Sequence, residues 1–514
     1  MSRILQALAW VAPKAALERA HAVALLSAKR EYDGARRDRR AGGWHAKGSS
    51  ANVELGPAIK LLRHRSRELV RNTSIGARLI DVLVAHIIGT GVLCVPQSGS
   101  DRLDKLLSEM FAEWAEYSDV EGELDFAGQQ MMALRSMLEG GDSITRFVDQ
   151  PLDGSRGLPM RLQVLEGDHL DESRDGGVLG TDARLGVILG EWGVRKGYWL
   201  FKRHPGEMIT IPAAQDLQMS VPVDRSEAVH LYRPLRPGMV RGVPVMSPIM
   251  LDARDFSDVR EAMVLRLKTE ACFSAFVRGT DSQPKMGQAK TDAVTGQRIE
   301  EVRPGMIHYM QPGEEVTFAT PAGSGAFEPV AMQALMGMAA GGMITYDQLT
   351  GDLRQANYSS LRAGKIEFRR MVEQLQHLVF VPMFLRRITS RFLDRAVLAG
   401  RITERQRDRA KFDYTMPGVE PIDPLKDLQA DILAVRSGRF SPQEFIEAWG
   451  KPWRQVLQEH EAFWKEADAS PSGLVFDIDP RRVSQLGVMQ TDTSEQEPAA
   501  SKAASKQKKD ANAA

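Results

Sequence analysis

Cysteine is nearly absent from this chain of 514 residues, with Cys94 and Cys272 its only two. Neither has a second cysteine or a Cys/His cluster near it in the sequence, so no structural zinc site is expected. The ten histidines are scattered and form no His-Glu-x-x-His motif. Such low cysteine usage fits a reducing compartment.

Long apolar runs are also missing, and therefore no transmembrane helix is expected. The first residues, "MSRILQALAWVAPKAALERA", faintly imitate a signal peptide. Lys14, Glu18 and Arg19 interrupt the apolar stretch, which argues against that interpretation. We interpret it as an amphipathic helix that breaks near Pro13 and continues to about Arg30.

The chain has no net charge, because 67 Lys and Arg residues balance 67 Asp and Glu residues. A strong nucleic-acid-binding chain is usually basic, so any DNA contact should be local, weak or transient. The basic stretch from Lys29 to Lys47 is interpreted as a solvated arm on a neighbouring subunit, with a nucleic-acid patch as the alternative. Residues 491–514 contain almost no apolar side chain beyond Ala, which predicts a disordered tail.

Recognisable catalytic signatures are missing as well. No Walker-type loop occurs, and "GSGAF" lacks the strand and helix of a nucleophile elbow. The acidic stretch "EGDHLDESRD" leaves one alternative, a metal-dependent DNA-processing enzyme that uses Asp168, Asp171 and Glu172. Asp also favours turns, and we interpret these residues as turn formers. The sequence therefore predicts no catalytic residue, no cofactor and no metal.

What the chain does contain is a mixture of helical and strand-like patterns. Apolar residues recur at helical spacing in several stretches, which predicts helices over 54–88, 101–117, 126–140, 248–277, 328–342, 360–398, 424–437 and 442–469. Short apolar runs alternate with Gly, Pro and Asp from Ile144 to His230, which predicts a β-rich unit. The fold class is therefore α+β.

The stretch "TGDLRQANYSSLRAGKIEFRR", from Thr350 to Arg370, begins as a polar loop and becomes a basic helix. Asn357 or Ser359 is the expected N-cap of that helix. Pro382 lies in the middle of its apolar run and predicts a kink. Gly400 is the expected stop. Further along the chain, Ser441 is the expected N-cap of the helix that begins at Pro442.

Six stretches together resemble the portal proteins of lambda-like tailed bacteriophages. In chain order they are "YDGA", "LRHRSRELVRNTSIGARLIDVLVAHIIGTGV", "VLEGDHLD", "HLYRPLRPGMVRGVPVMSPIM", "ITYDQLTGDLRQANYSSLRAG" and "IDPLKD". The resemblance covers about Tyr32 to Ala469. One departure is "WGKPW" at Trp449 to Trp453, where family members often have an acidic residue after the Gly.

The resemblance implies the portal-protein fold, with a helical wing, stem and crown and β-rich wing and clip elements. Laid on this chain, its parts are a 1–55 N-terminal arm, a 56–247 wing, a 248–277 stem helix, a 278–327 clip, a 328–342 second stem helix, a 343–362 tunnel loop, a 363–400 long kinked wing helix, a 401–490 wing remainder and crown, and the 491–514 tail.

The resemblance also implies a function. Family members form a homo-oligomeric ring, usually a dodecamer, at one capsid vertex, through which double-stranded DNA is packaged and ejected. The implied partners are the terminase large subunit, the major capsid or scaffold protein and head-completion or adaptor proteins, with no membrane. The implied location is the virion, after assembly in the host cytoplasm.

Two sets of residues are singled out by these motifs. The candidates for facing DNA from the tunnel loop are Arg354, Gln355, Asn357, Tyr358 and Arg362. The residues with expected structural roles are Arg236, Gly238, Arg241, Gly242, Pro244, Gly351, Asp352, Ser359, Ser360 and Pro382.

Overall fold

The computed structural model describes residues 48–149, 158–178, 181–207, 219–272, 327–354 and 357–470, together with a few isolated residues and short strands outside these ranges. The chain divides into two compact units, Met1–Ala58 and Ile59–Ala514. In the first unit, helix α3 spans Ala51–Leu55, and the Ser49 hydroxyl donates to the Glu54 carboxylate at 2.7 Å.

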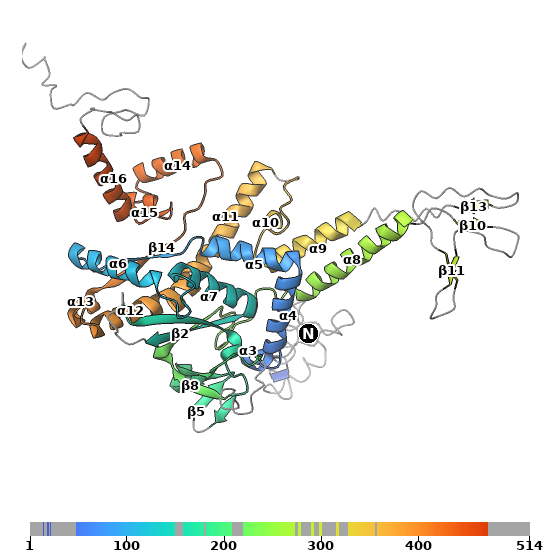
Figure 1. Ribbon diagram of the computed structural model, residues 1–514, viewed down its shortest axis with the longest axis horizontal. Helices are drawn as coiled ribbons and strands as arrows, with labels where there is room; N and C mark the ends of the chain where they lie inside the picture. The colour runs from blue at the N-terminus through green and yellow to red at the C-terminus, as the bar shows by residue number, and fades with distance from the viewer. Residues whose placement is uncertain are drawn as a thin grey trace, which may run out of the picture. The chain divides into compact units, whose positions relative to one another are not determined.

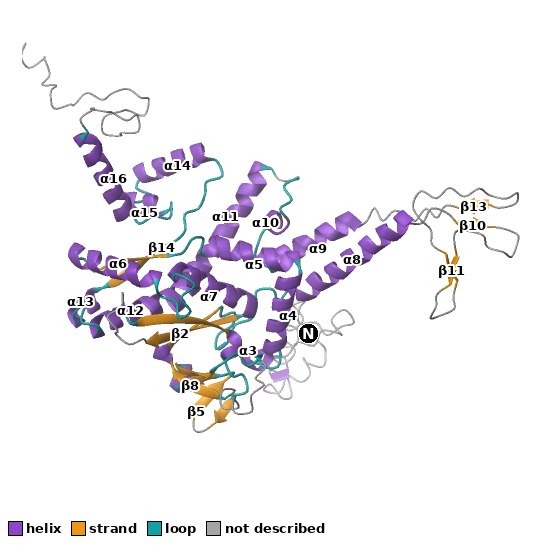
Figure 2. Cartoon of the chain, viewed as in Figure 1, coloured by secondary structure: helices purple, strands orange, loops and turns teal. Residues whose placement is uncertain are grey.

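The second unit carries most of the helices (Figures 1 and 2). They are α4 (Ile59–Asn72), α5 (Ser74–Ile87), α6 (Asp101–Glu116), α7 (Phe126–Gly140), α8 (Met250–Cys272), α9 (Phe327–Gly341), α10 (Tyr346–Thr350), α11 (Tyr358–Leu375), α12 (Arg386–Leu398), α13 (Glu404–Arg409), α14 (Pro424–Arg436), α15 (Pro442–Glu447) and α16 (Trp453–Ala469). Among the described residues, no helix combines the length and apolar character needed to cross a membrane.

The single helix expected over 54–88 is wrong, because the chain forms α4 and α5 with a break at Thr73. Thr73 has an extended backbone, and its hydroxyl accepts a hydrogen bond from the Gly76 amide at 3.1 Å. A Cβ on Gly76 would lie 2.5 Å from the Leu69 carbonyl oxygen. The N-cap therefore ends a continuous apolar stripe, and a glycine allows the two helices to approach closely.

The β-rich unit expected over 144–230 is confirmed as two antiparallel sheets. One has the order β3–β2–β9, built from β2 (Asp142–Asp149), β3 (Met160–Glu166) and β9 (Ala228–Tyr232). The other has the order β4–β5–β6–β7–β8, built from β4 (Gly176–Val178), β5 (Thr181–Arg184), β6 (Val187–Leu189), β7 (Arg195–Phe201) and β8 (Ser220–Asp224).

Three further strand pairs are antiparallel. Strand β1 (Leu93–Gln97) pairs with β14 (Lys411–Thr415) and so joins the beginning of this unit to its later part. Strand β10 (Phe276–Arg278) lies at the boundary between the expected stem helix and the expected clip and pairs with β13 (Glu315–Thr317). Within the expected clip, β11 (Ala289–Thr291) pairs with β12 (Arg298–Glu300). The sequence "GMIHYM" at 305–310 also has the short apolar pattern of a strand, but it lies outside the described residues.

Aromatic side chains join α6, α7, α12 and β14 in the main core. The Phe111 ring lies 5.3 Å from Trp114, 5.6 Å from Phe126, 5.1 Å from Phe392 and 5.5 Å from Phe412, measured between ring centroids. Trp114 is fully buried, and its indole N–H donates to the Met160 carbonyl at 2.8 Å. Burying each of these rings contributes about 1.5–3 kcal/mol relative to exposure.

The long helix around Pro382 continues without interruption from α11 to α12. Its middle, Gln376–Leu385, is π-helical and includes Pro382. A proline has no N–H and crowds the preceding turn of an α-helix, and π-helical turns are one way a helix accommodates such a disruption. Buried Gln376 donates to the Ile87 carbonyl at 2.7 Å and so ties this segment to α5.

Two expected helix boundaries are corrected. The helix expected over 442–469 is two helices, α15 and α16, because Gly450 has a φ of +82° and Pro452 follows it. The helix expected over 248–277 ends at Cys272, and strand β10 begins at Phe276. The expected N-cap at Ser441 is confirmed, since its hydroxyl accepts from the Glu444 amide at 3.1 Å.

Candidate functional site

The polar loop between α9 and α11 is held at its base by small residues. A Cβ on Gly341 would lie 2.4 Å from Ile249, and one on Gly342 would lie 2.2 Å from Leu79. The end of α9 therefore packs closely against the chain just before α8 and against α5. Arg78 of α5 donates to the Gln348 carbonyl at 2.9 Å and holds the short helix α10 to the same support.

A tight turn follows α10. Gly351 has a φ of +71° and donates to the Asp347 carbonyl at 2.7 Å, which ends the helix in the left-handed conformation that glycine favours. The Asp352 amide donates to the Thr350 hydroxyl at 3.1 Å. Glycine at position 351 therefore allows the chain to turn directly after α10.

Asp352 binds Arg354 through three hydrogen bonds. The Arg354 Nε and backbone amide both donate to Asp352 Oδ1 at 3.0 Å, and Nη2 donates to Oδ2 at 2.8 Å. The Tyr346 hydroxyl donates to Oδ2 at 3.4 Å. Hydrogen bonds from Arg354 lower the pKa of Asp352 to about 2, so its carboxylate is charged at neutral pH.

Asn357 is the N-cap of α11. Its side-chain oxygen accepts from the Ser360 amide at 2.8 Å, and the Ser360 hydroxyl accepts from the Asn357 amide at 3.2 Å. This reciprocal arrangement confirms Asn357, and not Ser359, as the cap. Ser360 therefore takes part in the cap through both its amide and its hydroxyl.

The five residues expected to face DNA have different environments. Arg354 is 77% exposed and binds Asp352, while Arg362 forms an ion pair with Asp427 of α14 at 2.9 Å. Gln355 lies outside the described residues, as do the side chains of Tyr358 and Ser359. Their orientation toward DNA stays a prediction.

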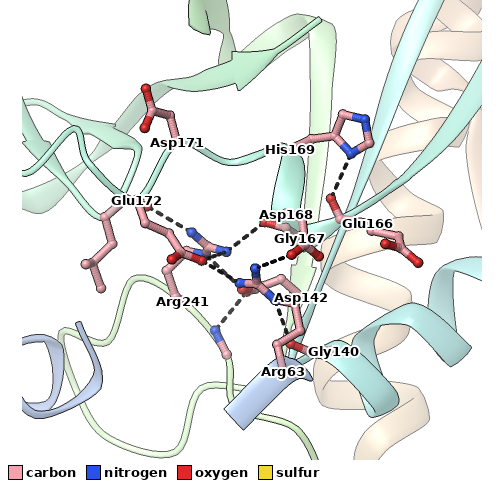
Figure 3. Close-up of polar contacts among 12 residues, drawn as sticks. Arg63, Gly140, Asp142, Glu166, Gly167, Asp168, His169, Asp171, Glu172 and Arg241 are labelled. Atoms are coloured by element: carbon pink, nitrogen blue, oxygen red, sulfur yellow. Dashed lines mark hydrogen bonds and ion pairs between the residues drawn. The ribbon is translucent and has the colours of Figure 1, made fainter. Parts of the chain in front are cut away.

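A second cluster consists of buried charges on several elements (Figure 3). Arg241 is fully buried; its Nε donates to Asp142 Oδ2 at 2.7 Å, Nη1 to the Leu185 carbonyl at 3.0 Å and Nη2 to the Gly167 carbonyl at 2.9 Å. Burial alone would raise the pKa of Asp142, but Arg241 and His230 together hold it well below its usual range. The pair joins β2 to the segment after β9.

His230 is held in its neutral form. Arg195 can only donate, so His230 Nδ1 accepts from it at 2.7 Å, and the ring proton on Nε2 is donated to Asp142 Oδ1 at 2.9 Å. Burial, with a contribution from Arg195 and Arg241, lowers the pKa of His230 to about 4 even though Asp142 favours the charged form.

Arg63 extends the cluster to α4. It lies 3.1 Å from Asp168 and 2.8 Å from Glu172, and its Nε donates to the Gly140 carbonyl at 3.4 Å. Burial opposes its charge most strongly, but the surrounding carboxylates outweigh burial and raise its pKa. Burial alone would raise the pKa of Asp168, but Arg63 and Arg67 together lower it to about 2.

Glycines allow the backbone to close around these charges. A Cβ on Gly242 would lie 2.0 Å from the Gly141 carbonyl oxygen, and Gly141 itself has a φ of +91°. The Gly242 amide donates to Asp142 Oδ1 at 2.8 Å. The lack of space therefore requires glycine at position 242, and its backbone amide adds a further hydrogen bond to Asp142.

The remaining residues of this motif shape the approach to α8. Gly238 has a φ of +78° in a turn where the Met239 amide donates to the Arg236 carbonyl at 3.2 Å. The Pro244 carbonyl accepts from the Ser247 hydroxyl at 2.7 Å and from its amide at 3.0 Å. These contacts use the backbone carbonyls of Arg236 and Pro244 and the left-handed backbone of Gly238. The structural role expected of the Arg236 side chain stays a prediction.

The acidic residues considered for metal catalysis already have protein partners. Asp168 and Glu172 bind arginines, and Asp171 accepts hydrogen bonds from Ser173 and Ser220 at 2.5 Å each. Among the described residues, Glu166, Asp168 and His204 are spaced closely enough for a metal ion. Arg67 lies 2.6 Å from Asp168 and 3.0 Å from Glu166, so a guanidinium already occupies the position that a cation would take.

Sequence reasoning missed most of the charge cluster. One signal was available: Arg63 falls on the buried face of α4 with Ile59, Ser66 and Val70, where an unpaired charge would be costly. Asp142 gave no such signal, because its partners come from distant parts of the chain.

Comparisons with known proteins agree on one family. The family model described as "Phage portal protein, lambda family" matches residues 37–376. The chain is 24% identical over 439 residues to the "Probable portal protein" of Halomonas phage phiHAP-1, covering 80% of this chain and 82% of that one. It is 22% identical over 470 residues to "Portal protein B" of Escherichia phage lambda, covering 81% and 85%.

A solved structure, "Neck of native GTA particle computed with C12 symmetry", has 15% identity and a TM-score of 0.42, covering 75% of this chain and 93% of that one. An HK97-family phage portal protein from Corynebacterium diphtheriae has 12% identity and a TM-score of 0.33, covering 71% and 96%.

Proposed function

Because the chain belongs to the lambda family of phage portal proteins, we propose that copies of it form a ring at one capsid vertex, with a central channel for double-stranded DNA. A portal protein is a structural component of the virion and not an enzyme. We further propose that the ring is a dodecamer, that DNA passes through its channel and that other virion proteins dock on it.

The main observation that supports the ring is the number of exposed apolar side chains on α8. This helix lies beside α9 (Figure 1), yet after Ala253 none of its described side chains is buried. Five large apolar residues are exposed by 45–68%: Leu251, Val259, Val264, Leu265 and Leu267. Several exposed apolar side chains on different sides of one helix favour protein partners, and neighbouring copies on both sides in a ring would bury them.

The C-terminal helices support the same proposal. Helices α14, α15 and α16 contain no buried residue, although Leu425, Leu433 and Leu457 are apolar. These three side chains are 67%, 63% and 57% exposed. Helices without a buried face gain little stability from packing within one chain, so contact with a neighbouring copy would stabilise them.

The DNA path is assigned to the polar loop at 343–362. In the ring, this loop would surround the channel, between the two stem helices and the long helix that begins at α11. The zero net charge of the chain suits a channel through which DNA must slide, because each phosphate contact adds affinity and would slow that movement.

The remaining partners follow from the same assignment. The segment at 278–327 would dock the terminase large subunit during packaging and then head-completion or adaptor proteins. The wing would contact the major capsid or scaffold protein, and assembly would take place in the host cytoplasm.

Purified full-length protein examined by negative-stain electron microscopy and analytical ultracentrifugation tests the proposal. The expected result is ring-shaped particles with a central hole and a mass of many subunits. A stable monomer at all concentrations and salt conditions would overturn it.

A further inference from the structure

Arg354 is the one arginine of the described tunnel loop before α11 begins. Its guanidinium already forms an ion pair with Asp352. Its Nε and Nη2 atoms contact the two oxygens of Asp352 at 3.0 and 2.8 Å. This is the side-by-side geometry with which arginine binds a phosphate. The Asp352 carboxylate therefore occupies the edge of the guanidinium that would otherwise bind DNA.

The turn holds Asp352 in this position. Gly351 at a φ of +71° sets the direction of the chain, and the Asp352 amide donates to the Thr350 hydroxyl at 3.1 Å. The Arg354 backbone amide donates to the same carboxylate at 3.0 Å. The Asp352 carboxylate is thus positioned by the backbone as well as by the guanidinium.

A second carboxylate lies on the other side of the guanidinium. Glu328 of α9 is 3.9 Å from Arg354 Nη1, and both side chains are largely exposed. The described turn therefore combines one cation with two nearby anions. An exposed arginine in this setting attracts a polyanion far less than its charge alone would suggest.

We propose that Asp352 is a positioning residue that shields Arg354 from DNA phosphates and so keeps the loop from gripping DNA. The inference rests on the proposed function, since it requires the loop to lie in the channel. With one shielded arginine per subunit, a ring would repeat the effect at every copy. Loss of the shield would add phosphate contacts, each of which steepens the dependence of DNA affinity on salt.

The test compares assembled rings of four variants: wild type, Asp352→Asn, Arg354→Gln and the double variant. Asparagine keeps the oxygen that accepts from the Arg354 amide but loses the charge. Binding of a fluorescent DNA duplex is measured by anisotropy across a salt series. Asp352→Asn should bind at least ~10-fold more tightly at low salt with a steeper salt dependence, and the double variant should return to the wild-type level.

Asp347→Asn is the matched control, because it removes one negative charge from α10 without a contact to Arg354 in the described turn. It should change DNA affinity less than Asp352→Asn does. Equal effects of the two variants, or wild-type affinity for Asp352→Asn, would overturn the shielding. The shielding would also be overturned if Arg354→Gln lost as much DNA affinity as Asp352→Asn is expected to gain, because Arg354 would then already contact DNA in the wild type.

Electron microscopy of each sample separates this inference from the proposed function. Rings with unchanged DNA affinity in Asp352→Asn would contradict only the shielding. Failure of the wild-type protein to form rings would contradict the proposed function itself.

Discussion

At the scale of single residues, the arginine of the "RGVP" sequence, Arg241, neutralises the buried carboxylate of Asp142. Arg241 and Asp142 are both fully buried and directly bonded. Removing one partner of such a pair leaves an uncompensated buried charge, which typically costs about 3–5 kcal/mol. Each member of the pair is therefore needed once the other is present, even if two apolar residues in their place would give a protein of equal stability.

Arg241→Ala should accordingly destabilise the protein by about 3–5 kcal/mol, seen as a much lower thermal unfolding midpoint by circular dichroism. Arg102→Ala, at an exposed position of α6, serves as the control and should change the midpoint little. Equal midpoints for the two variants would show that the buried cluster does not support the fold.

His230 makes stability depend on pH. Its pKa is about 4 in the folded protein and near 6.5 when unfolded, so between these values the unfolded chain binds more protons. Stability is therefore full above pH 6.5 and falls as pH drops toward 4, by about 1.4 kcal/mol per pH unit for one group. Burial also lowers the pKa of His86 and His169, and these histidines act in the same direction.

Unfolding measured at several pH values between 4 and 7 checks this effect. The amide of the His230→Gln variant can still donate toward Asp142. This variant should reduce the slope of the free energy of unfolding against pH by the contribution of about one proton. The other histidines should keep the remaining slope unchanged. An unchanged slope would mean that His230 is not held neutral in the folded state.

At the scale of elements, sequence reasoning was most reliable where local chemistry dominates. Helix α6 and the N-cap at Ser441 were predicted because apolar spacing and capping are local properties. The break at Thr73 was missed because an apolar stripe continues across it. The break near Gly450 was missed because apolar residues continue at helical spacing on both sides of it, while a left-handed glycine ends the helix between them.

The N-cap at Asn357 should stabilise the first turn of α11. Asn357→Ala removes the acceptor of the Ser360 amide and should cost about 1 kcal/mol locally, which corresponds to about fivefold faster hydrogen exchange at that amide. Asn357→Asp keeps an oxygen acceptor and should preserve the protection. Unchanged exchange in the alanine variant would contradict the capping role.

The long-range pairings could not be predicted. The contacts of Arg63 with Asp168, of Arg241 with Asp142 and of β1 with β14 join segments far apart in the chain, and no local pattern encodes them. The exposed loop was predicted from its polar composition. Its Asp352–Arg354 bond was missed, because it depends on the backbone turn at Gly351.

At the scale of the whole molecule, the exposed apolar side chains of α8 lead to a prediction about assembly. Val259→Asp places a charge on a surface that a neighbouring copy would bury, so the protein concentration needed for half-assembly should rise at least about tenfold, equivalent to about 1.4 kcal/mol. Mass photometry across a dilution series measures this shift.

Asp258→Asn changes the adjacent exposed residue and is the matched control. Its assembly should stay close to that of the wild type, with similar helix content in both variants. If Val259→Asp assembles as well as Asp258→Asn, α8 does not form a contact between subunits.

The most direct test of the whole proposal is a cryo-electron microscopy map of the assembled full-length protein. The predicted result is a closed ring in which α8 and α9 of adjacent copies surround a channel, with residues 343–362 at its narrowest point. A map that places residues 343–362 on the outer surface, or a protein that remains monomeric, would contradict the central claim.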